Sequence, residues 1–192
     1  MDFEKAKDAI LKKLTAELPP SLAYHSVEHV LDVLRAVEKH IAAQGITGHD
    51  AVLLRTAALY HDSGFTVQPE GHEELSCGIA GEMLPQFGYS PEDIDAICGM
   101  IMATRIPQSP KTPLEEILAD ADLDYLGRDD FFEISAKLFK ELKSRGLVSN
   151  EDQWNKIQLP FFENHRYFTA YAKAERNILK AEHFKILQSK IV

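Results

Sequence analysis

Hydrophobic residues recur at helical spacing from one end of the chain to the other. Residues 2–17 place apolar side chains on one face, and two prolines close the segment. A second periodic segment follows Ser26, which suits a helix N-terminus, and it ends at Gly45, which suits a helix C-terminus. Residues 50–60 are apolar almost all round, a pattern typical of a helix in the middle of a bundle.

Capping signals predict where later helices begin. Ser90 and Thr112 each stand directly before a proline and acidic residues, the arrangement of a helix N-cap and first turn. The segments with helical periodicity lie at 75–83, from 91 onward, 113–127, 131–142, 154–162 and 169–188. No run alternates like a strand, and no repeat or low-complexity tract is found; 144–150 reads as a connection between helices. We therefore predict an all-α fold and a single domain over residues 1–192.

Composition narrows the range of partners. Of the residues, 45% are hydrophobic and 27% charged, and the net charge is -9, so we expect no main role in nucleic-acid binding. No apolar run is long enough to span a membrane, and the N-terminus does not resemble a signal peptide. Only Cys77 and Cys98 are present, and we expect them to be buried and inert. These features predict a cytoplasmic protein.

Metal-binding residue types are concentrated in three short segments. His25 and His29 are four residues apart, so they share a helix face if the helix extends back to His25. His61 and Asp62 stand where the apolar helix should end, next to carbonyl groups that favour a cation. The third segment is an acidic run that contains Asp122. Two neutral imidazoles and two ionised carboxylates together carry the two negative charges that balance one divalent ion. An octahedral ion with these four ligands would keep room for a water and a substrate oxygen.

This ordered set resembles the HD-domain superfamily of metal-dependent phosphohydrolases. The resemblance covers roughly residues 24–127, with helices of 128–192 packing on that core. It implies that His29, His61, Asp62 and Asp122 bind one divalent metal ion, whose identity stays open among Mn, Fe, Co, Ni, Zn and Mg. It also implies hydrolysis of a phosphomonoester or phosphodiester in a small, nucleotide-like molecule.

The same resemblance suggests catalytic roles for three residues. Asp62 would accept a proton from the attacking water, and either His25 or His72 would protonate the leaving group. His25 is similar to the proton-donating histidine of cyclic-nucleotide phosphodiesterases, although Ser26 replaces the asparagine that usually follows it. The alternative for His25 is a hydrogen bond to the backbone beside the helix.

Three further residues are candidates for substrate binding. Arg105 would balance charge on phosphorus, Lys111 is a second nearby cation, and Glu73 would position water or phosphate beside His72. Lys111 also reads as a solvated loop charge, and His72 with Glu73 as an exposed pair at a helix N-terminus. Many family members carry another histidine one helix later, but the stretch 100–107 has none, so we expect one metal.

Other interpretations remain open at the level of sequence. A non-catalytic regulatory or binding module with a structural metal would use the same four ligands. A two-iron oxygenase on the same fold is a third reading, and the missing histidine argues against it. The C-terminal third could form a lid, a substrate wall or a homodimer surface. We expect His165 to be a packing residue and His40, His49 and His183 to lie at the surface; Asp120 and Asp124 either orient the ligands or are exposed.

Overall fold

The computed structural model describes residues 1–190, and they form an all-α fold, as predicted. No strand occurs within this range. The first helices are α1 (Phe3–Glu17), α2 (Val27–Gln44), α3 (Gly48–Tyr60), α4 (His72–Met83), α5 (Pro91–Ala103) and α6 (Pro113–Asp122). The last are α7 (Phe131–Ser144), α8 (Glu151–Asn164) and α9 (Ala170–Ser189). Three 3-10 helices, η1 (Ser63–Thr66), η2 (Leu84–Phe87) and η3 (Asp124–Gly127), lie between them.

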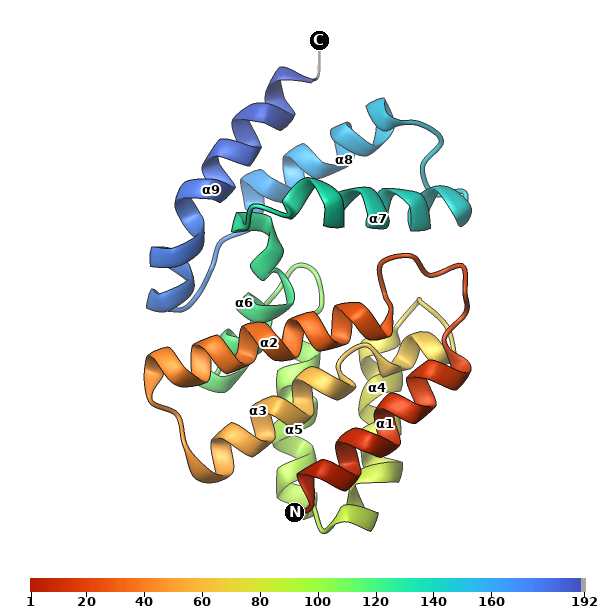
Figure 1. The fold of residues 1–192 in the computed structure, drawn as a ribbon, viewed down its shortest axis with the longest axis vertical. Coiled ribbons are helices and arrows are strands. Elements are labelled where there is room, and N and C mark those ends of the chain that lie inside the picture. The colour runs from red at the N-terminus through yellow and green to blue at the C-terminus, as the bar shows by residue number, and fades with distance from the viewer. Residues whose placement is uncertain (191–192) are drawn as a thin grey trace.

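The helices form two groups along the long axis of the molecule. Figure 1 shows α1 to α5 at one end and α7 to α9 at the other, with α6 and η3 between them. Helix α3 lies at the centre of the first group, and Leu54, Ala57 and Tyr60 are completely buried there. Burial on all sides explains why its sequence is apolar almost all round.

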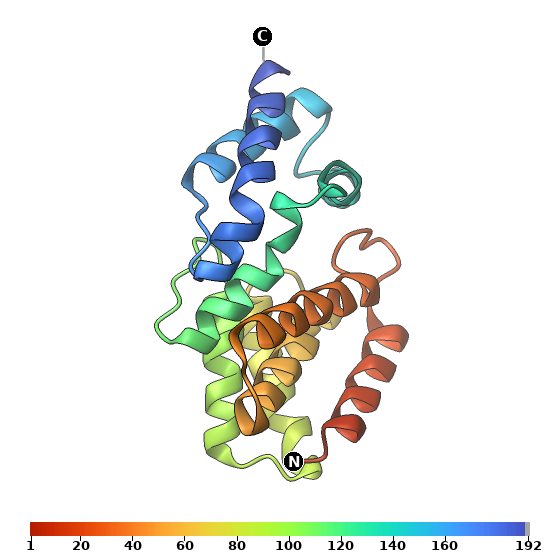
Figure 2. The same cartoon turned by 60° about the vertical axis from the view of Figure 1, so that its left-hand side comes forward.

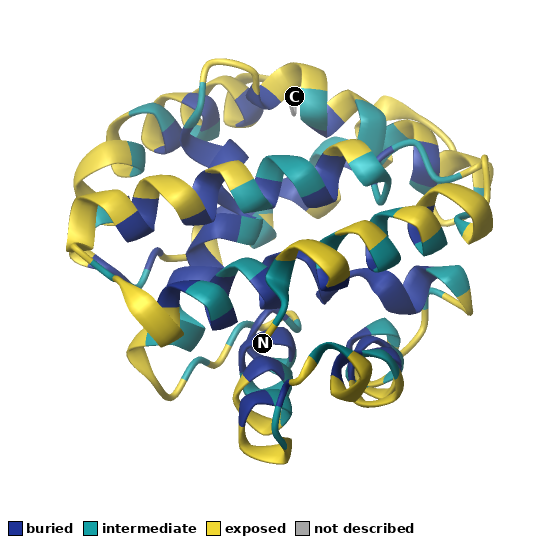
Figure 3. Cartoon of the chain, turned by 60° about the horizontal axis from the view of Figure 1, so that its bottom comes forward, coloured by how far each residue is buried: buried dark blue, intermediate teal, exposed yellow. Residues whose placement is uncertain are grey.

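The C-terminal helices have a smaller apolar core of their own. It includes Leu126, Phe131 and Phe162, together with Tyr24 from the loop before α2. Figure 3 shows that individual helices have buried residues on the face turned inward and exposed residues on the face turned to solvent. Figure 2 shows that the loop before α2 faces α7. Two segments distant in the sequence therefore face each other between the two groups.

Asp120 connects the two groups through hydrogen bonds. Its carboxylate is fully buried and accepts from the backbone N–H groups of Phe168 and Thr169 at 2.8 Å each, and from the Thr169 hydroxyl at 2.7 Å. The Thr169 hydroxyl in turn caps the first turn of α9. Asp120 thus fixes the start of α9 against the end of α6.

Most helix boundaries follow the predicted caps, but several details differ. Ser26, Ser90 and Thr112 are N-caps, and Gly45 ends α2 with a left-handed conformation at φ 66°. Helix α2 begins at Val27, so His25 precedes it and does not share a helix face with His29. The helix predicted to reach 127 ends at Asp122, and the 3-10 helix η3 follows.

Two histidines predicted at the surface are buried. His40 has no exposed surface, and its Nδ1 lies 3.2 Å from the Gln44 side-chain amide. His183 stacks on Phe131, with ring centroids 4.7 Å apart, and donates from Nδ1 to the Leu126 carbonyl. Both positions fall on the inner faces of helices, where an imidazole with a hydrogen-bond partner can be accommodated. His49 is exposed.

Candidate active site

Four predicted ligands meet where three helices end or begin. His29 lies in the first turn of α2, His61 and Asp62 follow α3, and Asp122 is the last residue of α6. His61 is completely buried, His29 and Asp62 are nearly so, and Asp122 is partly exposed. The helix packing therefore brings together residues that are up to about ninety positions apart in the chain.

The donor atoms of these residues form a tight cluster. His29 Nε2 lies 3.4 Å from His61 Nε2, 3.3 Å from Asp62 Oδ2 and 3.2 Å from Asp122 Oδ1. His61 Nε2 lies 3.3 Å from Asp62 Oδ2 and 3.4 Å from Asp122 Oδ1. Such spacings suit atoms that all lie about 2.0–2.2 Å from one ion. The buried Asp62 Oδ2 has no hydrogen-bond partner, so the donor set fits a divalent metal.

The segment after α3 is fixed so that His61 presents one particular nitrogen. His61 Nδ1 lies 2.8 Å from the Ala58 carbonyl, which can only accept, so Nδ1 is the donor and Nε2 is the free nitrogen. Ser76 donates to the His61 carbonyl at 2.7 Å and accepts from Gly64 N–H at 2.8 Å. Helix α4 thus holds both the ligand and the turn that follows it.

Close contact between imidazoles and carboxylates shifts the pKa values of the ligands. Burial lowers the pKa of His29, but its contacts with the Asp122 and Asp62 carboxylates outweigh burial and raise that pKa to about 9. Burial would raise the pKa of Asp122, yet its contacts with His29 and His61 lower that pKa to about 2. In the absence of metal, the cluster therefore keeps both carboxylates ionised and retains protons on its imidazoles.

Glu141 is a site residue that the sequence analysis missed. It lies on α7, is completely buried, and its Oε1 is 2.5 Å from His25 Nδ1. Its other oxygen accepts from the backbone N–H groups of Tyr24 and His25 at 2.8 and 3.0 Å. Phe65 stacks on the His25 ring at 3.9 Å. His25 therefore bonds a carboxylate through its ring, and no local sequence signal marks a partner 116 positions away.

His72 and Glu73 lie beside the ligand cluster at the start of α4. His72 Nδ1 lies 3.0 Å from the Pro69 carbonyl, so Nδ1 donates, and Nε2 is 3.5 Å from Asp62 Oδ1. Glu73 is buried and contacts Arg105 at 3.5 Å. The expectation of an exposed pair is wrong for Glu73.

The two cations predicted near the substrate are placed differently. Arg105 forms ion pairs with Glu73 and Glu74, so its charge is already balanced within the protein. Lys111 is exposed, and its backbone N–H donates to Glu115. Neither Arg105 nor Lys111 is among the residues that line a cavity beside the ligand cluster. Asp124, two positions after Asp122, forms an ion pair with Arg176 of α9, with Oδ1 and Nε 2.6 Å apart.

A cavity of about 330 Å³ opens beside the ligand cluster. Asp62, Asp122, His25 and His72 line its polar end. The remaining wall is mostly apolar and comes from η3, α7 and α8; it includes Tyr125, Leu126, Phe131, Leu138, Leu142, Trp154, Phe161 and Phe162. The C-terminal third therefore supplies a wall of the cavity, one of the three roles considered for it. The polar end can meet a charged group while the apolar wall receives an organic one.

Comparison with known proteins agrees with this architecture. The family model for the HD domain matches residues 23–124, which include the four predicted ligand residues, and the chain belongs to the HD-domain family. Members of this family are generally metal-dependent phosphohydrolases that bind divalent metals.

One solved structure has the same fold over the full length. It is a structural-genomics crystal structure of a protein from Lactobacillus plantarum, with a TM-score of 0.68 and 16% identity, and the match covers 99% of this chain and 98% of the other. No curated protein matches the sequence. None of the described helices combines the length and hydropathy of a membrane span.

Proposed function

We propose that the protein hydrolyses a phosphomonoester or phosphodiester of a small molecule with an apolar or aromatic organic group, such as a nucleotide. The observation that carries this proposal is the placement of His25, paired with Glu141, beside the ligand cluster at the polar end of one cavity. A divalent ion held by His29, His61, Asp62 and Asp122 would polarise the phosphoryl group and lower the pKa of a water bound to it.

His25 donates a proton to the leaving oxygen. Its Nδ1 is occupied by Glu141, so Nε2 is the nitrogen left to meet the substrate. Glu141 stays ionised, because its hydrogen bonds with His25 and with two backbone N–H groups outweigh burial and lower its pKa. A fixed carboxylate stabilises the cationic imidazole that a proton donor requires.

Asp62 and His72 hold the proton that the attacking water releases. Asp62 Oδ1 lies 3.5 Å from His72 Nε2, and both residues line the cavity. The apolar wall excludes water and binds the organic part of the ester, which explains the predominance of aromatic and aliphatic residues there. Arg105 is paired with two glutamates, so it contributes less positive charge to phosphate binding than the sequence suggested.

The test compares substrates whose leaving groups differ in whether they need a proton to depart. We would assay Mn-loaded protein with p-nitrophenyl phosphate, bis-p-nitrophenyl phosphate and nucleoside monophosphates, in wild type, His25→Gln, Asp62→Ala and the exposed control His49→Gln. Nitrophenolate leaves without a proton, so His25→Gln should lose about 10²–10⁴-fold on nucleotides and much less on nitrophenyl esters. Asp62→Ala should lose activity on all of them.

The same assay distinguishes the enzyme from a non-catalytic module. A module with a structural metal would bind the metal, lose stability in Asp62→Ala, and hydrolyse none of these esters. That outcome, or full activity in Asp62→Ala, would overturn the proposed function.

A further inference from the structure

The cavity beside the ligand cluster has acidic side chains but no basic one from Lys or Arg. Among residues 1–190, no lysine or arginine lines this cavity of about 330 Å³, whereas the acids Asp62, Glu73 and Asp122 do. Arg105 is paired with Glu73 instead, with Nη2 3.5 Å from Oε2. A negative group on the organic part of a substrate would therefore lose its hydration in this cavity without gaining a cation.

The ligand cluster leaves no positive charge for a second anion. Its two imidazoles, when neutral, and its two ionised carboxylates would neutralise one divalent ion. The ring of His25 is paired with the Glu141 carboxylate, with Nδ1 and Oε1 2.5 Å apart. One phosphoryl group at the metal already makes the occupied site negative, so a second phosphate or a carboxylate on the same molecule would be repelled.

The polar side chains in the wall of the cavity are bonded to the protein itself. Gln158 Oε1 accepts from the Ser135 hydroxyl at 2.7 Å, and Trp154 Nε1 donates to Ser135 Oγ at 3.3 Å. Gln158 Nε2 donates to Asn155 Oδ1 at 3.4 Å. Thr104 donates its hydroxyl to the backbone carbonyl three residues earlier at 2.8 Å. A nucleobase, whose edge carries several donors and acceptors, would therefore meet few free partners on this wall.

The two tyrosines that line the cavity lie at its ligand end. The ring centroid of Tyr24 is 4.5 Å from that of His29, and the ring centroid of Tyr125 is 5.8 Å from that of Tyr24. The polar groups of the cavity are thus gathered beside the metal ligands, where a phosphoryl group would bind.

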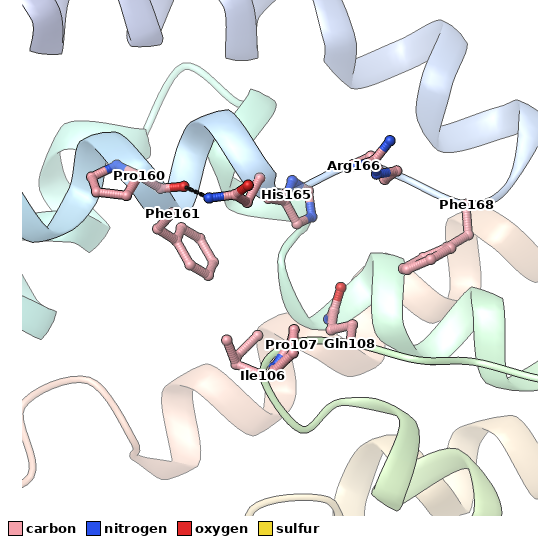
Figure 4. Close-up of a pocket in the computed structure, with 9 residues that line it drawn as sticks. Ile106, Pro107, Gln108, Pro160, Phe161, His165, Arg166 and Phe168 are labelled. Carbon is pink, nitrogen blue, oxygen red and sulfur yellow. Dashed lines mark hydrogen bonds between the residues drawn. The ribbon is translucent and has the colours of Figure 1, made fainter.

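Apolar side chains from both groups of helices form the rest of the wall. Leu138 and Leu142 come from α7, and Ile157 comes from α8. Figure 4 shows Phe161 of α8 together with Ile106 of the loop after α5, and both side chains line this cavity and the adjacent one. The surface that surrounds the organic part of a substrate is therefore aliphatic and aromatic.

We propose that this cavity selects phosphate esters of an uncharged, largely apolar alcohol, such as alkyl or aryl phosphates. The proposal rests on the proposed function and narrows its substrate class. A nucleoside monophosphate is then a weaker ligand than an alkyl phosphate of similar size, and a nucleoside di- or triphosphate is weaker still. Each methylene group buried against the wall should increase the affinity about fourfold.

Phosphonates test this selection independently of hydrolysis, because they contain no ester bond to cleave. Trp154 is the only tryptophan in the chain and lines the cavity, so its fluorescence reports on occupation of the cavity. We would titrate methylphosphonate, hexylphosphonate and 6-phosphonohexanoate into Mn-loaded protein, and measure affinity by calorimetry and Trp154 emission in parallel. The test variant is Ile157→Lys, at an exposed residue of the cavity, and the matched control is Ile178→Lys, at an exposed residue of α9 that does not line it.

The three probes should separate apolar contact from charge. We expect hexylphosphonate to bind about 10²-fold tighter than methylphosphonate, or more, and to shift Trp154 emission to shorter wavelength. The carboxylate of 6-phosphonohexanoate should cancel most of that gain. Ile157→Lys should weaken the binding of hexylphosphonate about tenfold and strengthen that of 6-phosphonohexanoate, because it replaces an apolar contact by a cation. Ile178→Lys should change neither.

Two results would overturn the proposal, whichever esters the protein hydrolyses. The first is equal affinity for methylphosphonate and hexylphosphonate, and the second is equal affinity for hexylphosphonate and 6-phosphonohexanoate. If hexylphosphonate binds as expected but no ester is hydrolysed, the proposed function fails while the selection for an apolar group is supported.

Discussion

His25 Nδ1 lies 2.5 Å from Glu141 Oε1, and this contact joins the loop before α2 to the last turn of α7. The carboxylate is completely buried and also accepts two backbone N–H groups from the same loop. One residue of the C-terminal third thus fixes both the backbone and the ring of the proposed proton donor. This relationship explains how helices beyond the matched family segment take part in the site.

Replacing Glu141 should therefore impair catalysis without removing the metal. In Glu141→Gln, the amide can still bond to the loop but cannot balance a cationic His25, so kcat should fall about 10–100-fold on nucleotide esters. Metal content, measured on the same sample, should remain at the wild-type level. Exposed Glu133→Gln on the same helix is the control, and an unchanged kcat in Glu141→Gln would show that the pair does not position a proton donor.

Metal binding should release protons and should tighten as pH rises. The pKa of His29 is about 9 in the metal-free protein, because Asp122 and Asp62 outweigh burial, so the imidazole is protonated at pH 7 and must lose that proton to bind a metal. The apparent affinity should therefore rise from pH 7 up to about pH 9. Calorimetry at one pH in two buffers of different ionisation enthalpy counts the protons. A count of zero at pH 7 would contradict this assignment.

His40 should make the fold sensitive to mild acid. Burial lowers the pKa of His40 to about 4, below its ordinary value of 6.5, so the unfolded chain takes up a proton that the folded protein does not. This contribution to stability is full above pH 6.5 and is lost as pH falls toward 4, by up to about 3 kcal/mol. Urea unfolding of His40→Phe should show a shallower decline over that range than wild type. If the free energy of unfolding falls equally with pH in wild type and His40→Phe, His40 does not cause the acid sensitivity.

Gly64 should tolerate no side chain, because helix α4 passes directly over it. A Cβ at Gly64 would lie 2.1 Å from the His72 carbonyl oxygen, a backbone atom at the start of α4. Gly64→Ala should therefore displace His72, destabilise the fold and weaken the metal site.

A second glycine gives the matched control for this effect. Gly78 lies within α4 with no atom within 4 Å of its Cβ position, so Gly78→Ala should stabilise the protein by up to about 1 kcal/mol. Thermal unfolding and metal content measure both variants. A Gly64→Ala protein as stable and as metal-rich as wild type would refute the close approach.

The sequence is most informative where structure depends on neighbouring residues. Ser26, Ser90 and Thr112 act as helix caps because a side-chain oxygen reaches an N–H group only three residues ahead, and such local signals predict helix starts well. The apolar third helix likewise predicts its own central position. The resemblance to the HD-domain family, which rests on residue type and order, implies the four ligand candidates, and the helix packing brings them together.

Features that depend on distant packing were not predictable in this way. Glu141 lies on an amphipathic helix and looks like any solvated acid until α7 packs on the loop that holds His25. His40 and His183 were predicted at the surface because a histidine on a helix gives no sign of which face is buried. By contrast, the prediction that His165 is a packing residue is confirmed, because its ring stacks on Phe161 with ring centroids 5.9 Å apart and meets Tyr167 edge-on at 4.8 Å.

The central claim is a single metal held by His29, His61, Asp62 and Asp122. Elemental analysis of purified wild type and Asp62→Ala, each with and without prior incubation with Mn, tests it most directly. We predict about one transition metal per chain in the wild type and its loss in Asp62→Ala, which removes the buried, unpartnered Oδ2. No metal in the wild type even after incubation with Mn, or two metals per chain, would contradict the account.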